Sequence, residues 1–169
     1  MFGQEEERSI VQYAEIVYRI AFHQLGKKED AEDIMQIVLL KFWQEARSFA
    51  SGEDSKRFLI RMTLNECRSL FRSPWFRRKA EFPEYEWEQL LNSAESAEDI
   101  ALAKQCSALY HAVMNLPEKY RSCTYLYYYE EYSVKEIAEI LGQKETTIQT
   151  RLMRARKILQ KQLLGNQFL

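Results

Sequence analysis

Apolar residues recur at helical spacing along most of the chain and predict an all-α protein. Between residues 9 and 25 they follow one another at steps of three and four, the period of one helix face, at Ile10, Tyr13, Ala14, Val17, Tyr18, Ala21, Phe22 and Leu25. Gly26 follows this run, and glycine commonly ends helices because it adopts left-handed backbone angles without a steric penalty. The pattern therefore predicts one amphipathic helix over residues 9–25.

Two further helices are predicted before residue 73. Acidic side chains between residues 29 and 33 favour the amino end of a helix, so the second helix is expected from residue 30 to residue 47. The residues that follow, SFASGEDS at 48–55, have the composition of a loop. The third helix is expected at 56–72, with apolar positions at Phe58, Leu59, Met62, Leu64, Cys67, Leu70 and Phe71. Residues 1–73 are thus expected to fold as one small helical domain.

The composition changes after this domain. Residues 80–103 contain seven acidic residues and no Lys or Arg, and Pro74 and Pro83 bracket the start of the stretch. A run of one charge sign is typical of a solvated segment. We expect a flexible acidic linker at 74–103, with at most short helices, between the first domain and a second small helical domain at 104–169.

The second domain carries the pattern of a helix-turn-helix. Helices are expected at 104–115 and 117–131, with Pro117 at a helix start, where proline is tolerated. Ser133 and Glu136 then form a capping-box pattern, in which each side chain bonds the backbone N–H of the other residue. Gly142 closes this short helix, and a longer helix follows the turn. A short helix, a tight turn containing glycine and a longer helix make a helix-turn-helix.

The longer helix concentrates positive charge. Residues 144–161 contain six basic residues and one acid, although the whole chain has 24 Lys and Arg against 25 Asp and Glu. At about 100° per residue, one face of this helix is an apolar stripe that consists of Ile148, Leu152, Ala155 and Leu159. We expect this stripe to pack on Ile137, Ile140 and Leu141 of the preceding helix. The opposite face holds Thr150, Met153, Arg154, Lys157 and Lys161. This distribution suits a helix in the DNA major groove, where cations bind phosphates; a solvated basic face is the alternative.

Other functional classes lack their residue patterns in this chain. No apolar run reaches the ~18–20 residues that span a bilayer, and the start, MFGQEEERS, is unlike a signal peptide. We therefore expect a cytoplasmic protein without membrane insertion. The spacing of Cys67, Cys106 and Cys123 fits neither a disulfide framework nor a zinc site and predicts three buried free thiols. Without a Gly-rich phosphate loop, a nucleophile beside a base or metal-ligand spacing, we expect no enzyme, no metal and no cofactor.

Two separate stretches resemble one known family. LPEKYRSCTYLYYYEEYSVKEIAEILGQKETTIQTRLMRARKIL resembles the promoter-reading carboxy-terminal domain of bacterial RNA polymerase sigma factors, of the small extracytoplasmic-function (ECF) type. AEIVYRIAFHQLGKKEDAEDIMQ, followed by LLKFW, is similar to the first conserved domain of that family, and FLIRMTLNECRSLFR resembles its next helix. The resemblance covers nearly the whole chain in the expected order.

This resemblance implies core RNA polymerase and promoter DNA as partners. It assigns core-polymerase docking to four residues of the second helix, namely Asp33, Gln36, Leu40 and Trp43. By the same resemblance, the loop 48–55 and the third helix capture an unstacked base of the proximal promoter element. The residues assigned to strand and phosphate contacts there are Arg61, Asn65, Arg68 and Arg72. The distal element would be read by Gln149, Thr150, Arg151, Met153, Arg154, Arg156 and Lys157. The linker would run toward the polymerase active-site cleft and RNA exit channel, and an anti-sigma factor is a further expected partner.

The chain departs from the usual pattern of the family at Ile37, Phe58, Ser69 and Thr146, and it lacks a basic residue at Gln149. Ile37 stands where the family usually has Glu. Two other interpretations of the residues remain. One is a stand-alone helix-turn-helix regulator whose amino-terminal helices dimerise or sense a partner, and the other is a helical adaptor that binds no DNA. A regulator would bind its operator alone, an adaptor would bind no DNA, and a sigma factor would need core polymerase.

Overall fold

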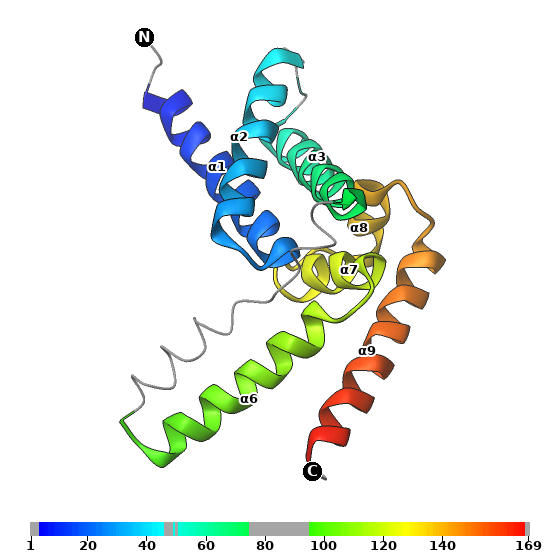
Figure 1. Cartoon of the computed structure of the whole chain (residues 1–169). Coiled ribbons are helices and arrows are strands. Elements are labelled where there is room, and N and C mark those ends of the chain that lie inside the picture. Colours follow the sequence, from blue (N-terminus) through cyan, green and yellow to red (C-terminus); the bar gives the residue numbers. More distant parts are fainter. Residues whose placement is uncertain (1–3, 46–48, 50, 75–94, 168–169) are drawn as a thin grey trace. The chain divides into compact units, whose positions relative to one another are not determined.

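The computed structural model describes residues 4–45, 49, 51–74 and 95–167, and all regular structure within them is helical. The helices are α1 (Gln4–Leu25), α2 (Lys28–Glu45), α3 (Gly52–Arg72), α6 (Ala97–Met114), α7 (Glu118–Tyr128), α8 (Val134–Leu141) and α9 (Glu145–Gln167) (Figure 1). Contacts divide the chain into two compact units, one built on α1–α3 and the other on α6, α7 and α9. The predicted all-α class with two small helical domains is confirmed. Most of the predicted linker, residues 75–94, lies outside the described residues.

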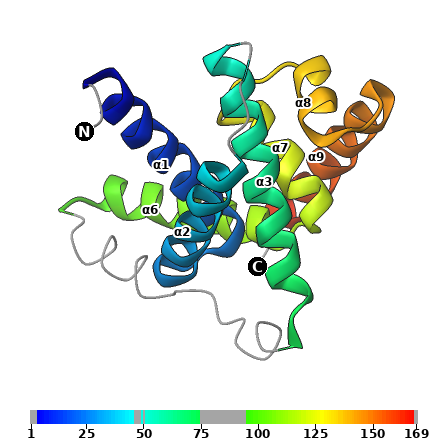
Figure 2. The same cartoon turned by 90° about the horizontal axis from the view of Figure 1, so that it is seen from above.

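In the first unit α1, α2 and α3 lie side by side, and each contacts the other two (Figures 1 and 2). Their shared core contains Val17, Ala21, Leu25, Ala31, Ile34, Val38, Leu59 and Cys67. Gly26 ends α1 at a positive φ of 71°, as its position in the sequence predicted. An ion pair between Lys41 of α2 and Glu66 of α3 adds a polar link at the surface.

Four helices begin earlier than the sequence suggested: α1 at Gln4 instead of residue 9, α2 at Lys28 instead of residue 30, and α3 and α6 as follows. We expected a loop up to residue 55, but α3 begins at Gly52 because the Ser51 side chain accepts a hydrogen bond from the Asp54 N–H at 3.2 Å. We expected a helix from residue 104, but α6 begins at Ala97 because Ser96 accepts from the Asp99 N–H at 3.1 Å. Acids in the first turn of both helices suit the positive end of the helix dipole. The final acids of the predicted linker therefore belong to a helix start.

The helix-turn-helix forms as predicted. The Ser133 N–H donates to Glu136 Oε2 at 2.8 Å, and the Glu136 N–H donates to Ser133 Oγ at 3.2 Å, which confirms the capping box. Gly142 follows α8 with a φ of 62°, the left-handed cap predicted for it.

The apolar stripe of α9 is buried. Ile148, Leu152 and Ala155 are buried and Leu159 is partly so. Ala155 and Leu159 pack in one cluster with Leu116 and Tyr120, at the start of α7. The burial fixes the rotation of α9 about its own axis.

The cysteines only partly follow the sequence prediction. All three are free, and Cys67 and Cys123 are buried, but Cys106 is exposed on α6. Among the residues that the structure describes, no group of three or more His, Cys, Asp and Glu side chains could hold a metal ion. In the same residues, no helix combines the length and apolar character needed to cross a membrane.

The turn between α7 and α8 holds one backbone conformation that is unfavourable for its residue. The helix predicted to residue 131 ends at Tyr128, and the chain reverses so that the Tyr132 N–H donates to the Leu126 carbonyl at 3.0 Å. Glu131, within this turn, has a φ of 57°. A side chain with a Cβ in this region is strained by roughly 1–2 kcal/mol.

We predict that Glu131→Gly stabilises the second unit by about 0.5–1 kcal/mol, because relief of this strain exceeds the added flexibility of the unfolded chain. Glu131→Ala is the matched control, since it removes the same side-chain atoms but keeps the Cβ, and it should leave stability nearly unchanged. Thermal or urea unfolding measures both. A lower melting temperature for Glu131→Gly than for Glu131→Ala would contradict the prediction.

Candidate functional site

One face of α2 exposes large apolar side chains. Ile37 is 41%, Leu40 60% and Trp43 49% exposed, whereas Ala31, Ile34 and Val38 of the same helix are buried in the core. Residues 33, 36, 37 and 40 share one helix face because they follow at helical spacing, and Asp33 and Gln36 are also exposed. Exposed apolar side chains gathered on one face mark an interaction surface. All four residues predicted to dock on polymerase lie on this side of α2.

Ile37 makes this surface more apolar than the family pattern suggested. It lies next to Leu40 on the helix, so the two side chains form one patch. The Trp43 ring packs edge-on against Phe42, with 6.4 Å between centroids. Phe42 in turn packs against Tyr13 of α1 at 5.7 Å. The core therefore supports the exposed tryptophan from behind.

The residues predicted to contact the proximal promoter element share one side of α3. Arg61, Asn65 and Arg72 are exposed and Arg68 is partly buried. Their spacing of four, three and four places them on one helix face. Arg68 Nη1 donates to Asn65 Oδ1 at 3.5 Å, which links two of them.

An aromatic side chain beside α3 was not singled out from the sequence. Phe49 lies in the loop before α3, with ring centroids 5.7 Å from Phe42 and 5.4 Å from Phe58. Phe58 stands where the family usually has Trp, and the cluster keeps an aromatic ring there. The only signal in the sequence was a Phe inside an otherwise small and polar loop.

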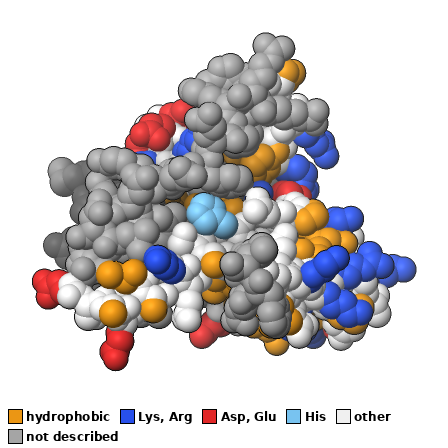
Figure 3. Space-filling view, turned by 60° about the horizontal axis from the view of Figure 1, so that its bottom comes forward, with side chains coloured by type: hydrophobic (Ala, Val, Ile, Leu, Met, Phe, Trp, Pro, Cys, Tyr) orange, Lys and Arg blue, Asp and Glu red, His pale blue; other side chains and the backbone are white. Residues whose placement is uncertain are grey.

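The outward face of α9 is polar and basic. Lys and Arg side chains gather on the side of the molecule where α9 lies (Figure 3). Of the predicted distal-promoter residues, Thr150 and Arg151 are partly buried, and the exposed ones are Gln149, Met153, Arg154, Arg156 and Lys157. Five of the seven therefore face solvent.

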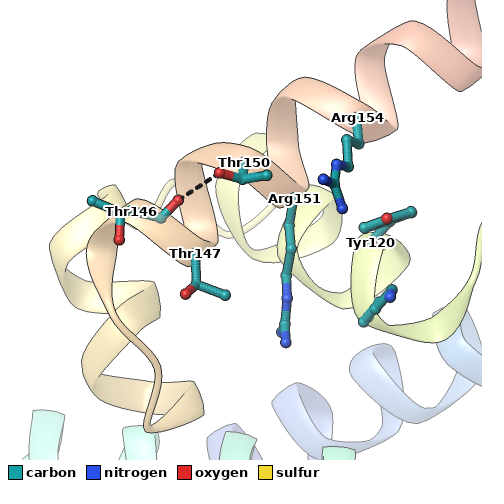
Figure 4. A pocket seen from close by; sticks show the side chains of 7 residues that line it. Tyr120, Thr146, Thr147, Thr150, Arg151 and Arg154 are labelled. Carbon is teal, nitrogen blue, oxygen red and sulfur yellow. Dashed lines mark hydrogen bonds between the residues drawn. The ribbon is translucent and has the colours of Figure 1, made fainter.

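An open recess of about 350 Å³ lies between the start of α7 and the first turns of α9 (Figure 4), and it is lined by Lys119, Tyr120, Thr146, Thr147, Thr150, Arg151 and Arg154. None of these lining residues is acidic. The Lys119 ammonium lies 5.1 Å from the centroid of the Tyr120 ring. A hydrogen bond with Arg154 lowers the pKa of Tyr120 below its ordinary 10.0, because the guanidinium favours the phenolate. The chemistry of the recess suits an anion.

Arg151 is engaged inside the second unit. Burial raises the pKa of the Cys123 thiol on α7, and the nearby Arg151 guanidinium partly opposes this rise. Figure 4 shows Arg151 and Arg154 pointing in different directions from α9, with Arg154 beside Tyr120. Arg151 therefore ties α9 to α7.

Comparison with known proteins matches both units. The sigma-70 region 2 family matches residues 10–77, and the sigma-70 region 4 family matches residues 106–159. The ECF RNA polymerase sigma factor SigW of Bacillus subtilis is 29% identical over 158 residues, covering 89% of this chain and 84% of SigW. The ECF RNA polymerase sigma factor SigM of Mycobacterium tuberculosis is 30% identical over 149 residues, covering 88% of this chain and 71% of SigM.

A solved structure shares the fold. The sigma factor RpoE, in complex with the anti-sigma factor NepR from Bartonella quintana, superposes with a TM-score of 0.64 at 20% identity, covering 95% of this chain and 98% of RpoE. The chain belongs to the sigma-70 family, with a region 2 and a region 4. Within that family it is an ECF sigma factor, which directs promoter-specific initiation of transcription. This family membership favours the interpretation of the chain as a polymerase subunit over that of a stand-alone regulator.

We predict that Arg151→Ala lowers the stability of the protein by about 1–2 kcal/mol, because it removes a partly buried side chain whose stem packs near Cys123 of α7. Arg154→Ala, one turn away and exposed, should change stability by about 0.5 kcal/mol or less. Thermal unfolding followed by circular dichroism compares the two variants. Equal melting temperatures would show that Arg151 does not hold α9 in place.

Proposed function

We propose that the chain binds core RNA polymerase through the exposed side of α2 and contacts promoter DNA through α3 and α9. The main support for this proposal is the difference in burial between the two opposite faces of α2. One face already fills the core, and the other still exposes Ile37, Leu40 and Trp43. Apolar side chains of this size suit the buried centre of a protein interface, and the neighbouring polar residues Asp33 and Gln36 suit its rim.

For the proximal promoter element, we propose strand and phosphate contacts from Arg61, Asn65, Arg68 and Arg72. Their common face on α3 gives a line of cations along which a backbone can run. Phe49 packs against both Phe42 and Phe58, and so an aromatic ring lies beside α3. Stacking on such rings favours single-stranded DNA.

For the distal element, we propose that Gln149, Thr150, Met153 and Arg154 face base edges while Lys157 binds the backbone. Side chains at the amino end of a recognition helix contact base edges, and cations farther along contact phosphates. Arg151, partly buried near Cys123 of α7, would contribute by packing α9 against α7. Arg156, which is exposed on α9, is proposed to contact the DNA as well.

The same proposal has consequences for the catalytic role, the location and the further partners of the chain. We expect no catalytic chemistry from this chain, because the polymerase performs the reaction, and we place it in the cytoplasm with core polymerase. An anti-sigma factor is a fitting partner, since RpoE, which shares this fold, is seen with NepR. Passage of the linker through the polymerase cleft stays a prediction, because residues 75–94 are outside the described part of the chain.

Reconstituted transcription tests the function as a whole. Core polymerase plus this chain should transcribe a limited set of sequences from a genomic promoter pool, whereas core polymerase alone should not. The chain alone should bind the same DNA weakly, because its net charge is only −1. Strong, selective binding by the chain without polymerase would instead indicate a stand-alone regulator.

The docking face predicts a specific binding defect. Leu40→Ala combined with Trp43→Ala should abolish co-purification with core polymerase, because truncated apolar anchors remove most of the energy of an interface. The melting temperature should be nearly unchanged, since both side chains are exposed. Val11→Ala, which truncates another side chain that is 65% exposed, serves as the control and should co-purify normally. Retained binding by the double variant would reject the docking assignment.

The recognition helix predicts two different DNA defects. Arg154→Ala should weaken binding to the selected distal element by about 1–3 kcal/mol and relax sequence preference, as expected for a base contact. Lys157→Ala should weaken binding to every sequence and reduce the salt slope by about one, as expected for a phosphate contact. Holoenzyme binding to selected and scrambled duplexes, at several salt concentrations, distinguishes the two. An equal loss on all sequences for Arg154→Ala would show that it binds only the backbone.

A further inference from the structure

The tyrosine-rich end of α7 is unusual, and one of its exposed rings holds an arginine of the recognition helix. Arg156 Nε donates to the Tyr128 hydroxyl at 2.6 Å. The Cζ atom of the Arg156 guanidinium lies 5.7 Å from the ring centroids of both Tyr127 and Tyr128. The two rings meet edge to face at 4.9 Å, so they form one rigid support. Arg156 is therefore held by a hydrogen bond and two cation–π contacts.

A second tyrosine of α7 lies beside a second arginine of α9. The ring of Tyr120 belongs to the core with Leu116 and Ala155, and Tyr120 and Arg154 line the recess side by side (Figure 4). The Arg154 guanidinium is also the largest cause of the lowered pKa of Tyr120. The buried ring thus fixes the position of the phenol that faces the arginine.

The two pairs lie on opposite flanks of α9. Arg154 and Arg156 are two residues apart and so about 200° apart around the helix. Between them, Ala155 is buried and packs on the α7 side. Tyr120 and Tyr128 are about 12 Å apart along α7, close to the diameter of a helix with its side chains. Since α7 packs against α9, it presents Tyr120 to the Arg154 flank and Tyr128 to the Arg156 flank.

We propose that Tyr120 and Tyr128 are positioning residues for promoter recognition, which hold Arg154 and Arg156 on the two flanks of α9 before DNA binds. The inference rests on the proposed contact of α9 with the distal element.

The physical advantage is pre-organisation. A free arginine side chain loses rotamer freedom when DNA immobilises it, and this loss weakens binding. A restrained arginine has already lost much of that freedom. The planar guanidinium of Arg156 carries five N–H donors, and Tyr128 uses only the one on Nε. The four N–H donors on the Nη atoms are left for a DNA acceptor. Restraint favours the sequence whose acceptors match the restrained orientation, and it therefore raises selectivity more than general affinity.

Removal of single tyrosine hydroxyl groups tests the positioning role of Tyr120 and Tyr128. Full-length Tyr120→Phe, Tyr128→Phe and the control Tyr129→Phe are each assembled with core polymerase. Tyr129 is a neighbouring exposed tyrosine that stacks on Tyr125 at 5.3 Å. Binding is measured to a duplex enriched by the wild-type holoenzyme from random sequence and to a scrambled duplex. Each phenylalanine keeps the ring, and unfolding curves check that the fold persists.

We expect the selectivity, the ratio of the two Kd values, to fall about 2- to 10-fold for Tyr120→Phe and for Tyr128→Phe, and to stay unchanged for Tyr129→Phe. In an Arg156→Ala background, Tyr128→Phe should have no further effect, because the side chain it positions is gone. Tyr120 should titrate below 10.0 in NMR of tyrosine labelled at ¹³Cζ, and Arg154→Ala should raise this pKa. A merely structural tyrosine would not show this coupling to one arginine.

The possible outcomes separate the inference from the function on which it rests. If the wild-type holoenzyme enriches no sequence, the proposed function fails and the inference fails with it. If it enriches a sequence and the Tyr120→Phe and Tyr128→Phe variants discriminate as well as the wild type, only the positioning role is overturned. An equal effect of Tyr128→Phe with and without Arg156 would also overturn it.

Discussion

Burial of the apolar stripe of α9 is the constraint on which the second unit depends. Once Ile148, Leu152 and Ala155 are inside, the rotation of the helix is fixed, and the side chains that remain outside are those of the basic face. Arg151, which is partly buried near Cys123 of α7, lies on the inner side of the helix. The exposed basic charge of α9 is therefore oriented by hydrophobic packing.

The first unit uses the same principle on α2. Ile34 and Val38 fill the core, and this fixes Leu40 and Trp43 on the outside, where Phe42 supports the tryptophan ring. Exposed apolar groups favour association, so their position on the outer face of α2 is best explained by a partner that covers them. Since the net charge of the chain is −1, long-range attraction to DNA is small. Attachment to polymerase would bring α3 and α9 to the promoter at high effective concentration.

Sequence periodicity predicted the helices well because apolar spacing and short capping motifs are local properties. The Ser133–Glu136 box and Gly142 were found where expected. The starts of α3 and α6 were missed because Ser followed by acids is a helix start and also the composition of a loop. The Tyr128–Arg156 pair could not be predicted, since it depends on how α7 crosses α9, and no local pattern encodes a crossing. The exposure of Cys106 likewise depends on tertiary packing.

Labelling of single cysteines on α9 tests the central claim, that packing turns one fixed face of this helix to DNA. Cys106→Ser removes the exposed native thiol, and Cys67 and Cys123 are buried, so an added cysteine at Met153 reports its own surroundings. In the holoenzyme, labelling of Met153→Cys should slow when the selected promoter is added, while Gln105→Cys on α6, also exposed, should label at an unchanged rate. Equal labelling of Met153→Cys with and without bound promoter would contradict the claim.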